Sequence, residues 1–174
     1  MALGFWLNLN GLLLIRLATP ADIPSILHLE RESAFAAHWT EQQYRQAFGS
    51  GGGKRFVLVA DTSFDSAADR TIVAAEAPNL LGFLVALHLV PEWELENIVV
   101  ATSARRQGLG KRLLRFLLAA ARETNSQSVF LEVRESNAAA RSLYEKMGFE
   151  QTGSRKAYYT NPVEAAVLYR LTLK

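Results

Sequence analysis

The sequence predicts a single α/β domain built on a mixed, mostly antiparallel sheet of about six to seven strands flanked by about four helices. Three observations lead to this class. The chain has 174 residues, within the common size of one domain, about 100–200 residues. Several strand-like segments follow one another without a helix between them, which favours antiparallel pairing. One helical segment, 109–122, stands between two strand-like segments, which indicates one parallel contact.

The composition is that of an ordinary globular protein, with 49% apolar residues, 21% charged residues and a net charge of +2. This balance argues against a protein that coats nucleic acid or binds membranes through a basic surface. The chain has no cysteine, which excludes disulfides, thiolate metal sites and a cysteine nucleophile, and favours the cytoplasm. We therefore expect no metal, no nucleic-acid partner and no membrane partner, and either a monomer or a dimer.

Residues 1–11 predict an apolar extension ahead of a domain at 12–174. The run has no basic residue before Arg16 and is interrupted by Asn8, Asn10 and Gly11. A signal peptide needs a basic start and an unbroken apolar stretch, and a membrane span needs about 20 apolar residues. We expect neither.

Capping residues and β-branched residues predict the helices and strands of the N-terminal half. Thr19-Pro20-Ala21-Asp22 and Thr40-Glu41-Gln42-Gln43 are capping boxes that open two helices, the second reaching about Phe48. Segments rich in β-branched and aromatic residues predict strands at 12–17, 55–61, 80–90 and 93–100. Residues 62–79 are polar and then alanine-rich, and we interpret them as a long hairpin connection.

The C-terminal half shows clear helical periodicity. Segment 109–122 predicts a helix whose apolar face carries Leu109, Leu113, Phe116, Leu117 and Ala120. A strand is predicted at 128–134 and a helix at 137–147, which ends at Gly148. Two closing strands are predicted at 150–159 and 165–173.

The glycine-containing segment before the 109–122 helix predicts an anion site. Gly108 and Gly110 permit a sharp turn where a strand passes into a helix. Successive backbone N–H groups at a helix N-terminus, with the positive end of the helix dipole, bind phosphate. Four cations in or beside this segment suit a pyrophosphate or a ribose phosphate: Arg105, Arg106, Lys111 and Arg112.

Two other phosphate motifs do not fit this segment. A Walker A loop requires Ser or Thr after its lysine, where this chain has Arg112. A dinucleotide fingerprint requires a third glycine, where this chain has Leu113. The structural alternative is an ordinary helix cap with solvated arginines.

The helix predicted at 137–147 presents Asn137 and Tyr144 on one face, two turns apart, with the small Ala140 between them. That face suits a thin ligand arm, with Asn137 bonding its amides and Tyr144 presenting a hydroxyl to a leaving sulfur. The alternative is structural, with Asn137 as the helix cap and Tyr144 in the core.

Acidic residues stand on two predicted strands. Glu132 interrupts an otherwise apolar strand, where burial would raise the pKa of its carboxyl, as at many catalytic sites. The alternative is an edge position with its carboxylate in water. Glu92, Glu94 and Glu96 alternate along an earlier strand, which is typical of a solvated face, although one of them could face a cleft.

Segments 96–100, 105–111, 131–134 and 136–149 together resemble the GCN5-related N-acetyltransferase (GNAT) superfamily. Within it they are most similar to the RimI-type ribosomal-protein-alanine N-acetyltransferases. The resemblance covers residues 94–173, including Arg155, Tyr158 and Tyr159, and upstream only the short motif His38-Trp39-Thr40-Glu41. It implies the GNAT fold and an enzyme that moves an acetyl group from acetyl-CoA to an amine.

The resemblance also implies roles for the residues that match its motifs. It assigns to acetyl-CoA binding Ile98, Val99, Val100, Arg105, Arg106, Gln107, Gly108, Leu109, Gly110, Lys111, Asn137 and Tyr144. It makes Glu132 the general base, acting through water, and Tyr144 the general acid toward the CoA thiolate. On the acceptor side it places Trp39, Glu94, Glu96 and Tyr159.

The acceptor stays open between a protein N-terminus and a small-molecule amine, and a non-catalytic acetyl-CoA sensor is a further alternative. Freeing an amine of its proton at pH 7 costs about 1.4 kcal/mol for an α-amine and about 4.6 kcal/mol for lysine, which favours the N-terminus. Three features depart from the RimI type: residues 62–79, the apolar extension, and Ala165-Ala166, where such proteins carry a second acid.

Overall fold

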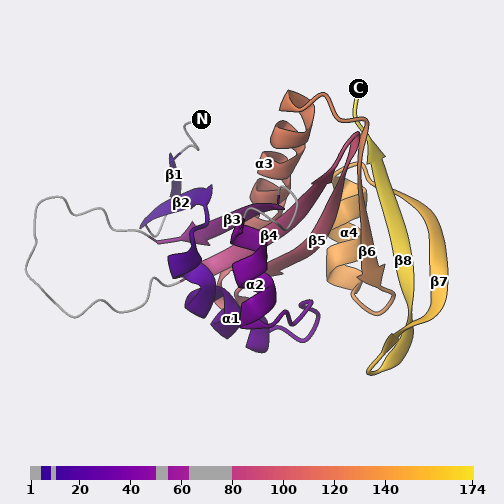
Figure 1. The fold of residues 1–174 in the computed structure, drawn as a ribbon, viewed down its shortest axis with the longest axis horizontal. Helices are drawn as coiled ribbons and strands as arrows, with labels where there is room; N and C mark the ends of the chain where they lie inside the picture. Colours follow the sequence, from indigo (N-terminus) through magenta and orange to yellow (C-terminus); the bar gives the residue numbers. More distant parts are fainter. Residues whose placement is uncertain (1–4, 9–10, 50–54, 63–79) are drawn as a thin grey trace, which may run out of the picture.

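The computed structural model describes residues 5–8, 11–49, 55–62 and 80–174 (Figure 1). The described residues form one eight-stranded sheet in the order β1-β2-β3-β4-β5-β6-β8-β7, in which only β5 and β6 are parallel. The single mixed α/β domain predicted from the sequence is confirmed. The strands are β1 Phe5–Asn8, β2 Gly11–Leu17, β3 Arg55–Asp61, β4 Leu80–Leu89, β5 Glu92–Val100, β6 Ser128–Arg134, β7 Glu150–Thr160 and β8 Val163–Thr172.

The helices of the described residues follow the predicted order. They are α1 Ile23–Arg31, α2 Glu41–Phe48, α3 Leu109–Glu123 and α4 Ala138–Lys146, with short 3-10 turns at Pro20–Asp22 and Thr102–Ala104. No helix among the described residues is both long enough and apolar enough to span a bilayer. The helices α2, α3 and α4 begin and end within a few residues of their predicted bounds, and α1 follows the predicted capping box.

The sheet has more strands than predicted, because part of segment 1–11 belongs to it. Phe5–Asn8 pairs antiparallel with β2, so that Phe5 stands opposite Leu14 and Asn8 opposite Gly11. The predicted connection at 62–79 lies, after residue 62, outside the described residues.

Capping boxes begin the N-terminal helical segments as predicted. The Thr40 backbone N–H donates to Gln43 Oε1 (2.8 Å), and the Gln43 N–H donates to Thr40 Oγ1 (3.3 Å). At the other box, the Thr19 N–H donates to Asp22 Oδ2 (2.7 Å). The Arg16 guanidinium donates to Asp22 (2.7 and 2.8 Å) and to Asp61 (2.9 Å), which joins β2, β3 and the Pro20–Asp22 turn.

The pKa of Asp22 reflects this cluster. Burial acts to raise the pKa, but the hydrogen bonds from Arg16 and Thr19 more than offset burial, and the pKa falls below its usual value. A depressed folded-state pKa contributes stability above the unfolded pKa and loses it as the pH falls through the folded one. The stabilisation that the ion pair between Arg16 and Asp22 contributes is therefore lost only at acidic pH.

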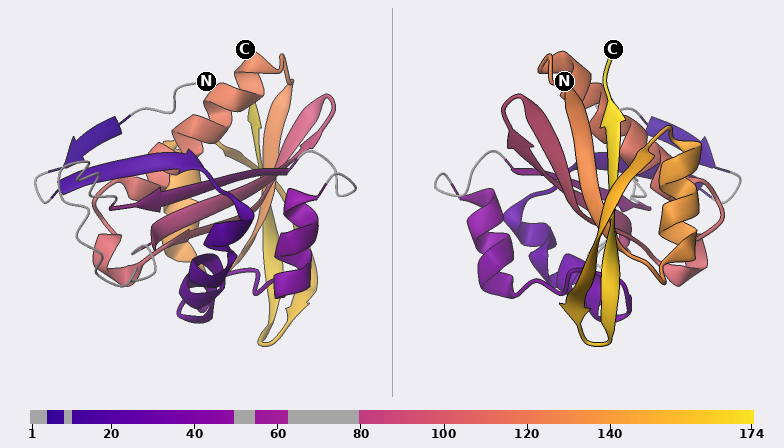
Figure 2. Two further views of the ribbon diagram at one scale, coloured as in Figure 1. Left: turned by 60° about the vertical axis from the view of Figure 1, so that its left-hand side comes forward. Right: turned by 90° about the vertical axis from the view of Figure 1, so that its right-hand side faces the viewer.

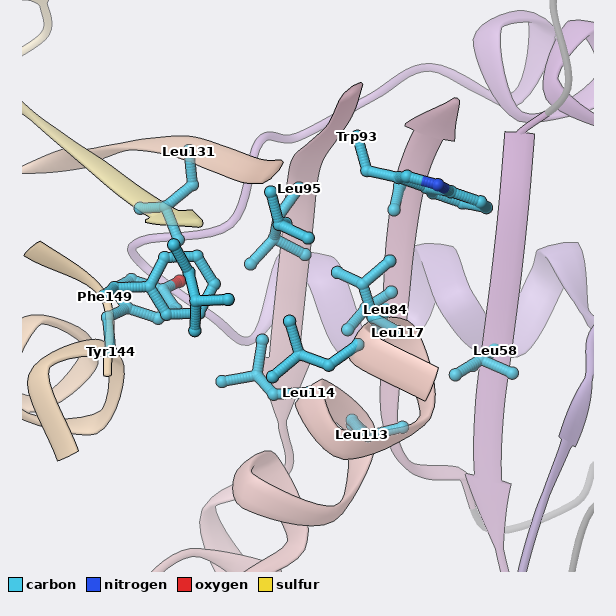
Figure 3. Close-up of a cluster of buried hydrophobic side chains, with 14 of the residues drawn as sticks. Leu58, Leu84, Trp93, Leu95, Leu113, Leu114, Leu117, Leu131, Tyr144 and Phe149 are labelled. Carbon is cyan, nitrogen blue, oxygen red and sulfur yellow. The ribbon is translucent and has the colours of Figure 1, made fainter. Parts of the chain in front are cut away.

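Two hydrophobic clusters cover the two faces of the sheet, because strand side chains alternate between faces. On β3, Leu58 and Ala60 pack in the cluster beneath α3 and α4, called the α3 cluster. Val57 and Val59 pack in the cluster beneath α1 and α2, called the α1 cluster. The views in Figure 2 show the two helix pairs on opposite sides of the sheet. Figure 3 shows the first cluster, in which leucines of α3 meet β3, β4, β5 and β6.

Leu114 lies at the centre of the α3 cluster and is 0% exposed. We expect Leu114→Ala to lower the free energy of unfolding by about 2–5 kcal/mol, because truncation removes buried contacts and leaves a cavity. Arg115→Ala, an exposed change on the same helix, should shift it by less than about 0.5 kcal/mol. Urea unfolding measures both, and equal shifts would contradict this description of the core.

An extra residue in β5 changes which face its side chains occupy. Asn97 stands opposite Val85 and Leu95 opposite Ala86, so Glu96 forms a β-bulge. Such a bulge bends the strand and shifts its alternation by one residue. Accordingly Leu95 packs in the α3 cluster, whereas Val99, an even number of residues away, packs in the α1 cluster.

The parallel contact between β5 and β6 is short. It joins Glu92–Leu95 to Ser128–Leu131 and ends there. Beyond it the two strands diverge, as Figure 1 shows, with α4 beside the opening. The later residues of β5 therefore lack a neighbouring strand on the side of β6.

Candidate active site

A cleft of about 420 Å³ lies where β5 and β6 diverge. Its walls come from the loop between α1 and α2, the bulged part of β5, the end of β6, α4 and the end of β7. The lining residues are Phe35, Ala36, Ala37, His38, Trp39, Glu94, Leu95, Glu96, Asn97, Ile98, Glu132, Val133, Arg134, Asn137, Ala140, Tyr144, Tyr158 and Tyr159.

Eight of the seventeen residues to which the sequence analysis gives a catalytic, acetyl-CoA-binding or acceptor-binding role line this cleft. They are Trp39, Glu94, Glu96, Ile98, Glu132, Asn137, Tyr144 and Tyr159. Val99 and Val100 do not line it, because Val99 packs in the α1 cluster and Val100 packs against the α3 cluster. A role for their backbone groups in ligand binding remains a prediction.

The predicted anion segment lies at the N-terminus of α3, outside the cleft-lining residues. Gly108 has φ +81° and caps the helix, a backbone conformation that favours glycine. The Arg112 N–H donates to Gly108 O (3.1 Å), so the N–H groups of the three preceding residues lie in the turn where helices leave donors unpaired. A further hydrogen bond fixes the loop before α3, in which the Arg105 Nε–H donates to Val100 O (3.1 Å).

Gly110 has a packing role that its sequence position did not reveal. A Cβ added there would stand 3.0 Å from Leu143 Cδ2, so the absence of a side chain lets α3 approach α4. The two glycines therefore have different roles. Gly108 permits the turn before α3, and Gly110 permits the close contact between α3 and α4.

Asn137 and Tyr144 combine the structural and functional interpretations. Asn137 Oδ1 accepts from the Ala140 N–H (3.2 Å) and caps α4, which leaves its NH₂ group as the part that a ligand can use. Tyr144 is 4% exposed, and its ring lies 5.8 Å from that of Phe149 (Figure 3). The Tyr144 ring also lies 6.1 Å from that of Tyr169. Burial raises the pKa of the Tyr144 hydroxyl far above its usual value, so the group stays protonated at neutral pH.

Three of the carboxylates at or beside the cleft are held by arginines. Arg155 Nη1 lies 3.0 Å from Glu132 Oε1. Arg55 pairs with Glu96 (2.8 Å), and Arg134 pairs with Glu164 (2.6 Å). Glu132 also accepts a hydrogen bond from the Tyr158 hydroxyl, which is the main cause of a raised Tyr158 pKa.

Glu94 differs from these carboxylates. No ion-pair partner of Glu94 is found among the described residues. Burial, and then the like charges of Glu96 and Glu132, raise the pKa of Glu94. Glu94 is thus a cleft-lining carboxyl group with a raised pKa, on the strand where alternation favoured a solvated face but left open that one acid faces a cleft.

Arg134 and Glu30 were not expected from the sequence. The Arg134 guanidinium lies 4.1 Å from the centre of the Tyr159 ring and so fixes an aromatic wall of the cleft. Glu30 lies behind the cleft and binds two of its wall residues. A signal for Glu30 was present, because it follows Ile23 and Ile26 at helical spacing and therefore falls on the apolar face of α1.

Residues 25–149 match the acetyltransferase (GNAT) family. The chain belongs to this family, as the resemblance predicted, and is an acetyl-CoA-dependent N-acetyltransferase. It is 32% identical over 154 residues to the [ribosomal protein bS18]-alanine N-acetyltransferase of Escherichia coli K12, a match that covers 87% of this chain and 92% of that protein.

Solved structures agree with this assignment. The crystal structure of the ribosomal-protein-S18-alanine N-acetyltransferase from Escherichia coli matches with a TM-score of 0.73 and 26% identity, over 93% of this chain and 94% of that one. Arabidopsis thaliana NAA60 in complex with a bisubstrate analogue matches with a TM-score of 0.76 at 17% identity, over 93% and 99% of the two chains. The second match shows a shared fold.

Proposed function

We propose that this enzyme acetylates the N-terminal α-amine of a protein, with alanine as the acceptor residue. Two findings support the proposal: the similarity over most of the chain to an enzyme named for alanine N-acetylation, and the charge of the cleft. Glu94 and Glu132 face the same space. Glu132 is paired with Arg155, whereas no ion-pair partner of Glu94 is found among the described residues, and its carboxylate attracts an ammonium group. The cleft is also walled by aromatic side chains, among them Trp39 and Tyr159, which suit the first residues of a peptide.

The proposed reaction is direct attack of the neutral amine on the thioester carbonyl. The new C–N bond forms as the C–S bond breaks, the amine proton passes through water to Glu132, and the Tyr144 hydroxyl gives its proton to the departing sulfur. Backbone groups of β5 beyond Leu95 have no β6 partner, so they are available to polarise the carbonyl. The N-terminal turn of α3, with Arg105 and Lys111, would hold the pyrophosphate.

The buried Tyr144 hydroxyl beside an acidic cleft is the observation that carries this mechanism. A tyrosine that remains protonated at neutral pH is a competent proton donor to a thiolate. Glu132 is the proposed base, and Glu94 is the second candidate because its raised pKa brings it nearer to the working pH. A cytoplasmic location and a monomeric or dimeric state remain predictions.

Release of free CoA from acetyl-CoA tests the proposal with two matched peptides. One has a free N-terminal alanine and no lysine, and the other has a blocked N-terminus and one lysine. We expect release with the first peptide alone. Release with the lysine peptide alone would overturn the α-amine assignment. Release with neither, while acetyl-CoA still binds, would indicate a small-molecule acceptor or a sensor.

A further inference from the structure

A buried carboxylate lies behind the cleft, on α1. Glu30 is 1% exposed, and its Oε1 accepts from Asn97 Nδ2 (2.7 Å) and from the Trp39 backbone N–H (3.2 Å). Its Oε2 and the hydroxyl of nearby Tyr44 are buried without a hydrogen bond of normal geometry among the described residues. Burying an ionisable group with an unused oxygen is costly, so its retention needs a reason other than packing.

Both donors to Glu30 belong to the cleft wall. Asn97 directly follows the bulged Glu96 and directly precedes Ile98, and Trp39 ends the 35–39 loop. Glu30 itself is not among the cleft-lining residues. The carboxylate therefore joins two cleft-lining segments that are far apart in the sequence, the 35–39 loop and the β5 bulge, without facing the cleft.

Further contacts continue this connection along the same wall. The Trp39 ring lies 5.4 Å from the Tyr44 ring, and the Arg55 guanidinium lies 5.4 Å from the centre of the Trp39 ring. Arg55 in turn pairs with Glu96. The loop and the bulge are thus tied twice, through buried Glu30 on the inside and through Arg55 on the outer side.

We propose that Glu30 is a positioning residue, which sets the spacing between the 35–39 loop and the β5 bulge and so determines how well the acceptor binds. The inference rests on the proposed function only in taking this wall as the acceptor side. The pyrophosphate end of acetyl-CoA is proposed to lie at the N-terminus of α3, and among the described residues no hydrogen bond or ion pair joins Glu30 to that segment. Changes at Glu30 should therefore affect the acceptor much more than acetyl-CoA.

The geometry predicts which substitutions are tolerated. Glutamine keeps an oxygen that can accept from both Asn97 and the Trp39 N–H, and its NH₂ group can donate to the Tyr44 hydroxyl. Alanine removes the acceptor altogether and leaves both donors unpaired in a buried place. Asn97→Ala removes the same tie from the side of β5.

The test compares acceptor KM, kcat and the Kd for acetyl-CoA in Glu30→Ala, Glu30→Gln and Asn97→Ala. Loss of the buried tie in Glu30→Ala should raise acceptor KM about tenfold, with the Kd for acetyl-CoA within about twofold, and Glu30→Gln should stay within about threefold of wild type. The double variant Glu30→Ala with Asn97→Ala should raise acceptor KM by less than the product of the two single increases, because both substitutions remove the same interaction. Glu32→Ala, an exposed change just after α1, is the matched control and should leave all three values unchanged.

A merely structural role would lower the melting temperature while acceptor KM stays unchanged, or would weaken acceptor and acetyl-CoA equally, and either result overturns the inference. If Glu30→Ala does not fold, Glu30→Gln and Asn97→Ala decide the question by the same criteria. Hydrogen exchange at the Trp39 amide needs no acceptor, and it should be faster in Asn97→Ala than in wild type. Unchanged exchange and KM in that variant would contradict the inference even if the acceptor proves not to be an α-amine.

Discussion

Tyr144→Phe is expected to lower kcat by about 10²-fold or more, with the Kd for acetyl-CoA changed by less than about twofold. The substitution removes only the hydroxyl, which burial keeps protonated, and leaves a ring that still packs against Phe149. The thiolate would then depart without a proton donor, whereas the contacts that bind the ground state persist. Steady-state kinetics and a binding titration measure the two quantities separately.

Tyr169→Phe is the matched control for this change. Tyr169 is also buried, and its ring lies 6.1 Å from that of Tyr144, but its hydroxyl donates to Glu145 (2.6 Å) and accepts from Arg141 (3.3 Å). Loss of the Tyr169 hydroxyl should lower the free energy of unfolding and leave kcat near the wild-type value. Equal losses of turnover and acetyl-CoA affinity in Tyr144→Phe would show that Tyr144 serves binding, not proton transfer.

Glu132→Gln is expected to lower kcat by about 10²-fold, because the attacking amine would lose the group that takes its proton. Arg155→Gln removes the ion-pair partner of Glu132 but keeps the carboxylate. This substitution should lower kcat far less than Glu132→Gln does. Kinetics of the two variants with a saturating acceptor measure this difference. A larger kcat loss in Glu94→Gln than in Glu132→Gln would move the base to Glu94.

The pH dependence distinguishes the two carboxylates further. The ionised form of Glu94 attracts the acceptor ammonium, and its raised pKa means that this form is lost earlier than usual as the pH falls. Acceptor KM should therefore rise in the wild-type enzyme between about pH 7 and about pH 5, and should rise less in Glu94→Gln, where it is already high.

The strands and helices could be predicted because their causes are local. The capping boxes at Thr19 and Thr40 and the periodicity of α3 depend on residues a few positions apart, and the structure confirms them. The β-bulge at Glu96 could not be predicted, since it is defined by the register of β5 against β4. The face that Val99 occupies relative to Leu95 depends on that bulge. Alternation alone left open which of Glu92, Glu94 and Glu96 faces the cleft.

The site was predicted only as far as its residues carry recognisable motifs. Asn137 and Tyr144 were identified by their spacing on one helix face, and both line the cleft. Ion pairs across the fold, such as Arg134 with Glu164 and Arg55 with Glu96, depend on tertiary structure that no local pattern reveals. The buried Glu30 could have been recognised as an acid on the apolar face of α1.

The most direct measurement uses a single peptide that carries both a free N-terminal alanine and an internal lysine. After incubation with enzyme and acetyl-CoA, fragmentation mass spectrometry locates the acetyl group. Acetylation of the α-amine alone is the predicted result. An acetyl group on the lysine, or an unmodified peptide together with a functioning small-molecule acceptor, would contradict N-terminal acetylation as the activity of this enzyme.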